Sequence, residues 1–119
     1  MKILLITSIY LPHIGGIELY VKNLAANLIA KGHDVSVFVG DRFVKKISDS
    51  VEYGIKTIRV PVFYFKGMTY LRSKAGRKIL EKELSSAKVV HLNDLKFLYK
   101  FLAQKKSIYG YKLFFSSHG

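Results

Sequence analysis

Two adjacent glycines, Gly15 and Gly16, lie in the first stretch of the sequence whose residues could carry chemistry. They belong to segment 10–18, which follows an apolar run and precedes a stretch of helical periodicity. At such a junction, backbone N–H groups and the helix dipole can bind an anion, and glycine lets a phosphate approach the main chain closely. A Gly–Gly pair is also a common tight turn, so these residues alone leave phosphate binding and a structural turn both open.

Histidine, glutamate and asparagine side chains supply the other groups that could bind or react. His13 and Glu18 flank the glycines, where Glu18 could orient the loop or contact a ligand. His91 and Asn93 follow a short apolar run, and each could face a substrate or cap a turn. His118 follows the last apolar run. If the runs are parallel strands, these residues stand at their carboxyl ends, where α/β sheets bind ligands.

Several classes of site are excluded by the sequence. It has no cysteine, which excludes disulfides, thiolate metal sites and a cysteine nucleophile. The spacing of His13 and His33 does not suit metal ligation, so we predict no metal site. Neither a P-loop nor a G-x-G-x-x-G pattern follows the first apolar run. Asp41 follows the second run, where it could bind a dinucleotide ribose or act as a solvated turn residue.

The elements that must position these residues alternate between strands and helices. Apolar runs predict strands over residues 2–7, 35–39, 55–62, 89–92 and 112–117. Helical spacing predicts helices over residues 17–29, 71–84 and 95–105. Pro61 is expected to end the third strand, and residues 42–54 are ambiguous. We therefore predict an α/β fold in which residues 1–119 form one domain, a Rossmann-like parallel sheet with helices on both faces.

Positive charge is concentrated in the second half of the chain. The formal net charge is +12. Residues 1–60 contain 8 Lys or Arg against 5 Asp or Glu, whereas residues 61–119 contain 12 against 3. Such an imbalance indicates a polyanionic partner, which could be an anionic membrane surface, nucleic acid or a phosphorylated substrate. A solvated basic face is the alternative.

Aromatic and basic residues mix in segment 63–78 and again in 96–106, a composition suited to anionic lipid. Their apolar members could instead face the core or another domain. The N-terminal apolar run is too short for a secretory signal, and no stretch reaches the ~18 apolar residues of a spanning helix. We expect a cytoplasmic protein, with peripheral association at the inner face of the membrane as a further option.

Several motifs occur in an order that resembles a known enzyme family. They are PHIGGIE at 12–18, LA with a following leucine at 24–28, KGHDV at 31–35, VVH at 89–91 and FSSHG at 115–119. This series is similar to the N-terminal signature of glycosyltransferase family four. The resemblance covers nearly the whole chain and is weakest between residues 41 and 88.

The resemblance implies one half of a GT-B fold, the N-terminal, acceptor-side domain of a retaining glycosyltransferase. Gly15 and Gly16 match glycines that approach the donor diphosphate, and His118 matches a catalytic histidine beside the transferred sugar. His13, Glu18, His91 and Asn93 are expected to contact the acceptor or orient the loop. The implied donor is a nucleotide-sugar, with no other cofactor, and the acceptor is a sugar or a lipid-linked molecule of glycoconjugate synthesis.

The second domain of such enzymes, which holds the nucleotide and carries an E-x(7)-E motif, has no counterpart in this sequence. We therefore expect a fragment that folds but needs a C-terminal domain, in cis or in trans, to catalyse transfer. One alternative is a stand-alone subunit. Another is a basic binding module, although the absence of a nucleic-acid recognition motif argues against nucleic acid as its partner.

Overall fold

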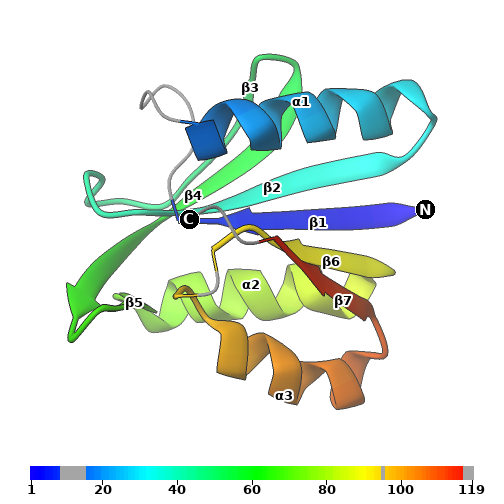
Figure 1. Cartoon of the computed structure of the whole chain (residues 1–119). Helices are drawn as coiled ribbons and strands as arrows, with labels where there is room; N and C mark the ends of the chain where they lie inside the picture. The colour runs from blue at the N-terminus through cyan, green and yellow to red at the C-terminus, as the bar shows by residue number, and fades with distance from the viewer. Residues whose placement is uncertain (9–15, 95, 117–119) are drawn as a thin grey trace.

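A computed structural model of the chain describes residues 1–8, 16–94 and 96–116 (Figure 1). Parallel strands form the body of one sheet, namely β1 (Lys2–Thr7), β2 (Asp34–Asp41), β4 (Ile55–Phe65), β6 (Val89–Leu92) and β7 (Lys112–Phe115). Two further strands, β3 (Ser48–Glu52) and β5 (Met68–Leu71), run antiparallel to β4. The order across the sheet is β3-β4-β2-β1-β6-β7, with β5 paired to β4.

Strand β1 lies inside the sheet because its side chains are apolar on both faces. Ile3 and Leu5 pack toward α1 (Gly16–Ala30), whereas Leu4 and Ile6 belong to the larger core on the opposite side. That core lies under α2 (Lys74–Ser86) and α3 (Tyr99–Tyr109), so helices cover both faces of the sheet (Figure 1). The predicted Rossmann-like α/β fold is confirmed.

Strand β4 corrects the prediction that Pro61 ends the third strand. It continues to Phe65, and Pro61 itself pairs with Asp41 of β2. The Pro61 carbonyl accepts the Arg72 N–H at 3.1 Å, just beyond the last β4–β5 pair, Val62 with Leu71. Proline therefore lies at the end of that ladder, where its missing N–H removes only a terminal hydrogen bond.

The remaining differences from the prediction arise around this hairpin. Residues 68–71 form β5, so α2 begins at Lys74 rather than at 71, with the Ser73 hydroxyl accepting the Gly76 N–H at 3.1 Å. Helix α3 spans Tyr99–Tyr109 rather than 95–105, and β3 occupies part of the ambiguous segment 42–54. No helix within the described ranges combines the length and apolarity needed to cross a membrane.

Candidate functional site

The carboxyl ends of β1, β6 and β7 lie together at one side of the sheet (Figure 1). We call this region the carboxyl edge and define it by the polar residues Ser8, His91, Asn93, Asp94 and Ser116. Helix α1 begins at Gly16 on the same side. Because the amide groups of a helix N-terminus favour negative charge, this side of the sheet suits an anionic ligand.

His91 connects the ends of β6 and β7. It occupies the third position of β6, pairs with Phe114 of β7 and is half-buried. Its Nε2 lies 2.7 Å from the Ser116 hydroxyl oxygen, so the imidazole and the hydroxyl share a hydrogen bond whose direction depends on the tautomer. The predicted His91 is thus at a strand's carboxyl end, held against the segment that leads toward residue 118.

Asn93 ties the ends of β6 and β1 together and is buried. Its backbone N–H donates to the Ile6 carbonyl at 2.8 Å. Its side-chain Nδ2 donates to the carbonyls of Ile6 and His91, both at 3.3 Å. The Oδ1 atom is buried and has no hydrogen-bond partner among the residues that the structure describes. A buried acceptor without a protein partner is uncommon in native proteins, and a water or a ligand hydroxyl could donate to this one.

Ser8 and Asp94 complete the carboxyl edge and were not singled out as site residues from the sequence. The Ser8 hydroxyl donates to Asp94 Oδ2. Asp94 Oδ1 accepts the Lys96 N–H at 3.0 Å, so this carboxylate fixes the turn after β6 rather than the start of α3. The available signal was that Ser8, like Asn93 and Asp94, directly follows the apolar run of a strand.

For several other predicted site residues, the residue or its side chain lies outside the part of the chain that the structure describes. His13, Gly15 and His118 lie outside the described residues, so their assignments stay predictions. Gly16 is the first residue of α1. Glu18 lies in the first turn of that helix, but its side chain is outside the described part. The structure therefore places Gly16, His91 and Asn93 on the side predicted for them and leaves their roles as predictions.

Comparison with known protein families shows which family this chain belongs to. The model described as "Glycosyltransferase Family 4" matches residues 14–119. This chain belongs to glycosyltransferase family 4. The match includes α1, the ends of β6 and β7 and every residue of the carboxyl edge except Ser8. A search of curated proteins found no match.

A solved structure with the same fold supports the architecture of this family 4 domain. It is a sucrose-phosphate synthase from Thermosynechococcus elongatus, which shares 18% sequence identity and superposes with a TM-score of 0.61. The alignment covers 99% of the present chain but only 33% of the synthase chain. At this identity the likeness supports the fold, and the chain spans about a third of that protein's length.

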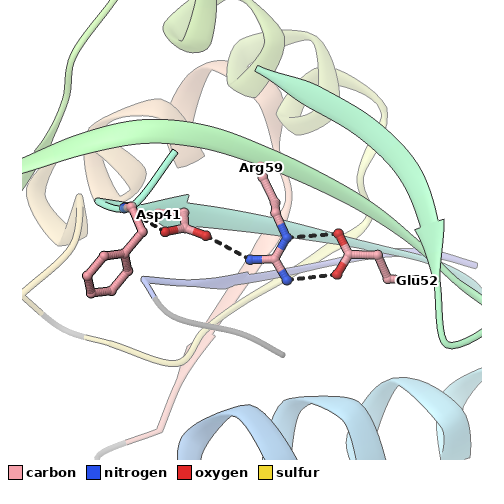
Figure 2. Close-up of polar contacts among 4 residues, drawn as sticks. Asp41, Glu52 and Arg59 are labelled. Atoms are coloured by element: carbon pink, nitrogen blue, oxygen red, sulfur yellow. Dashed lines mark hydrogen bonds and ion pairs between the residues drawn. The ribbon is translucent and has the colours of Figure 1, made fainter. Parts of the chain in front are cut away.

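In this family 4 domain, Asp41 belongs to a buried ion cluster (Figure 2). Its Oδ1 accepts the Phe43 N–H at 2.8 Å, and its Oδ2 lies 3.0 Å from Arg59 Nη1. Arg59 also donates to both Glu52 oxygens, from Nε at 2.8 Å and from Nη2 at 2.7 Å. Asp41 is thus not the solvated turn residue considered above. Its carboxylate oxygens hold protein groups, which favours a structural role over ribose binding.

An apolar groove adjoins the carboxyl edge of the family 4 domain on the α1 side of the sheet. Its volume is about 430 Å³, and its lining residues are Ile3, Leu5, Leu24, Leu28, Val89, His91, Phe114 and Phe115. His91 is the polar member of this lining, so its ring lies between an apolar surface and the Ser116 hydroxyl. Within the described ranges, no three His, Asp or Glu side chains gather as metal ligands would.

Proposed function

We propose that this chain is the acceptor-side domain of a retaining glycosyltransferase. In this proposal the enzyme moves a sugar from a nucleotide-sugar to an acceptor, which is a sugar or a lipid-linked molecule. The observation that carries the proposal is the family 4 match over residues 14–119, which spans both α1 and the carboxyl edge. The proposal assigns the donor half of the reaction to the start of α1 and the acceptor half to the carboxyl edge.

The donor half of the proposal relies on the start of α1. The helix begins at Gly16 beside the carboxyl ends of the strands, and its first amides have no partners within the helix. A diphosphate placed there would receive hydrogen bonds and the favourable end of the helix dipole. Gly15 and Gly16 carry no Cβ that would keep the phosphates away from the main chain.

The acceptor half relies on the carboxyl edge. Sugar hydroxyls donate and accept hydrogen bonds, and this edge combines a hydroxyl, an imidazole, a carboxylate and the unsatisfied Oδ1 of Asn93. His118 follows β7 by three residues, and the proposal places its imidazole beside the transferred sugar. The His91–Ser116 hydrogen bond would fix the segment that precedes His118 in the chain.

A second domain is part of the proposal, because one helix terminus offers few contacts for a nucleotide. We propose that it is supplied in cis or in trans and holds the base and ribose of the donor. The chain alone is then expected to bind a nucleotide-sugar weakly and not to transfer its sugar. The mass of the native polypeptide, detected with an antibody against this domain, distinguishes the two arrangements.

Replacing His118 by alanine tests the proposed catalytic position in the complete enzyme, meaning this domain together with its donor-binding domain. The measurement is sugar transfer from a nucleotide-sugar, followed by nucleotide release. Loss of a positioned imidazole is expected to lower kcat by about 10²–10⁴-fold. The matched control is His33→Ala, because His33 precedes β2 at the amino end of the sheet, away from the carboxyl edge.

The two variants together separate chemistry from folding. Both should keep the circular dichroism spectrum of the parent, while only His118→Ala loses transfer. Full activity in His118→Ala would refute the proposed role of that residue. A complete enzyme that neither binds nor consumes any nucleotide-sugar would refute the proposed function as a whole.

A further inference from the structure

Five large aromatic side chains are exposed around the β4–β5 hairpin, on the same side of the molecule as the carboxyl ends of the strands (Figure 1). We call them, together with Arg42 and Lys66, the hairpin surface. The aromatic members and their exposed fractions are Phe43 (60%), Phe63 (41%), Tyr64 (45%), Phe65 (58%) and Tyr70 (43%). Single exposed apolar residues are ordinary, but five large ones gathered around one hairpin mark an interaction site.

Side chains alternate along β4, so Phe63 and Phe65 lie on one face of the hairpin and Tyr64 lies on the other, and contacts occur on both faces. The rings of Phe63 and Tyr70 stack across the β4–β5 ladder with centroids 5.6 Å apart. The Arg42 guanidinium lies 5.0 Å from the ring centroids of both Phe43 and Tyr64, which joins the segment after β2 to the hairpin. The side-chain nitrogen of Lys66 lies 5.4 Å from the centroid of the Phe65 ring.

The hairpin is anchored to the body of the molecule while these rings face outward. Lys66 and Gly67 both have positive φ, of 50° and 79°, as a two-residue hairpin turn of type I′ requires. Thr69 is buried, and its N–H donates to the Lys96 carbonyl at 3.0 Å. The alternative that the apolar residues of this segment fill the core is therefore wrong for residues 63–65 and 70, whereas Leu71 packs against the core.

The charge around the hairpin has a single sign over a long stretch of sequence. From residue 53 to residue 80 there are seven Lys or Arg and no Asp or Glu. Of these cations only Arg59 is buried, where it pairs with Asp41 and Glu52. Asp41, which precedes the hairpin surface in the chain, is also buried within that cluster. The solvent side of the hairpin surface therefore presents cations beside aromatic rings and is complementary to an anionic partner.

We propose that the hairpin surface docks the domain on an anionic membrane. Tyrosine rings settle at the headgroup level of a bilayer, phenylalanine rings insert at the boundary with the acyl chains, and neighbouring Lys and Arg attract anionic lipids. A projecting ridge fits a deformable, extended surface of this kind. Single-stranded nucleic acid is instead bound in a basic groove with ring faces open to bases, whereas Arg42 lies over two of these rings and Phe63 and Tyr70 stack on each other.

A fluorescence experiment tests insertion directly, because the chain contains no tryptophan. Phe65→Trp places a single reporter on the hairpin surface, and Ile108→Trp places one at an exposed position of α3 outside it. Adding vesicles of phosphatidylcholine and phosphatidylglycerol should shift the emission of the first variant to shorter wavelength and leave the second unchanged. An equal response of both variants, or none from either, would overturn the proposal.

Vesicle co-sedimentation tests whether membrane binding depends on the cations of the hairpin surface or only on the net charge of the chain. Lys66→Asn keeps a residue that tolerates positive φ and removes one cation from the hairpin surface. Lys31→Asn removes the same charge at the turn after α1, at the amino end of the sheet. Partitioning onto the anionic vesicles should fall about fivefold for the first variant, from about 1 kcal/mol per cation, and little for the second.

The remaining outcomes of these binding measurements are equally decisive. Phe63→Ser with Phe65→Ser should reduce partitioning, whereas Val51→Ser, on exposed β3, should not. Equal loss in both lysine variants, or equal binding to pure phosphatidylcholine, contradicts the proposal. So does tighter binding of single-stranded RNA that weakens in the same hairpin variants, which would assign the surface to nucleic acid. Because only binding is measured, the result does not depend on the proposed transfer reaction.

Discussion

The guanidinium of Arg59 joins three strands through one side chain. It contacts Asp41 at the end of β2 and Glu52 on β3, while Arg59 itself belongs to β4. The Arg59 and Asp41 side chains are nearly inaccessible, with exposed fractions of 7% and 3%. In such a cluster each charge offsets the desolvation cost of the others. Removing one member therefore lowers the free energy of unfolding by more than the whole cluster contributes to it.

Arg59→Met is therefore expected to lower the free energy of unfolding by about 3–5 kcal/mol, since it leaves Asp41 buried without its cation. Urea unfolding followed by circular dichroism measures the change. Lys105→Met is the matched control, because the Lys105–Glu81 pair is more exposed, at 27% and 29%. That control should lose no more than about 1 kcal/mol. Similar losses in the two variants would contradict the structural importance of the cluster.

At the same scale, the sequence predicted the positions of individual residues better than it predicted their contacts. His91 and Asn93 could be placed at a strand end because an apolar run precedes them. Their contacts depend on strand register, since Ser116 lies 25 residues from His91 in the chain. Ser8 and Asp94 are separated by 86 residues. Such pairs become visible only once β1, β6 and β7 are known to be neighbours.

At the scale of elements, the parallel strands and the helices were predictable, and the two antiparallel strands β3 and β5 were not. Runs such as residues 2–7 carry their signal in apolar side chains that the sheet buries on both faces. Strand β3 is exposed along nearly its whole length, so residues 48–52 show no alternation to detect. The extension of β4 past Pro61 depends on β5, whose pairing follows from the turn at residues 66–67.

Replacing two glycines in different elements by alanine is expected to change the free energy of unfolding in opposite directions. In β2, a Cβ on Gly40 would lie 2.6 Å from Phe97 Cζ and 2.8 Å from Val62 Cγ1, within the packed core. Gly40→Ala is expected to destabilise the domain by about 1–3 kcal/mol. In α2, a Cβ on Gly76 would meet Ser73 Oγ at an ordinary 3.5 Å.

Gly76→Ala is accordingly expected to raise the free energy of unfolding by about 0.5–1 kcal/mol, since alanine favours the helix and restricts the unfolded chain. Thermal and urea unfolding of both variants give the comparison. A stabilising Gly40→Ala would show that β2 and the Phe97 ring are not packed as described.

Alkaline pH should weaken the junction of α3 and β7. Burial raises the pKa of Tyr111 to about 12 from an unperturbed value of 10.0. Its hydroxyl donates to the Leu102 carbonyl of α3, so the folded state holds the protonated phenol. Because the pKa of Tyr111 is higher in the folded state than in the unfolded state, the protonated phenol stabilises the fold. This contribution to the free energy of unfolding is complete below about pH 10 and is lost as pH rises toward about 12.

Unfolding measured from pH 8 to about 12 should therefore show a fall in stability above pH 10 that becomes shallower in Tyr111→Phe. That variant also loses the hydroxyl hydrogen bond, so it should start from a lower stability at neutral pH. Tyr53→Phe, at a position that is 60% exposed, is the control and should follow the parent curve. An unchanged alkaline slope in Tyr111→Phe would contradict the assignment.

At the scale of the whole molecule, the proposed transfer site and the proposed membrane-docking surface lie on the same side of the domain. The start of α1, the carboxyl edge and the hairpin surface all lie where the parallel strands end (Figure 1). Docking through the hairpin would therefore hold the proposed acceptor site close to a bilayer, as a lipid-linked acceptor would require.

The position of β1 inside the sheet also bears on how the chain is made. Among the described strands it is synthesised before the others, and β2 can pair with one side of it early, through Lys2 and Asp34. Its other neighbour, β6, pairs Ile3 with Val89 and is synthesised roughly fifty residues after β2, which takes about 3–10 s at usual translation rates. During that interval an apolar strand has one unpaired edge, so we expect the nascent domain to be prone to aggregation and to chaperone binding until β6 is synthesised.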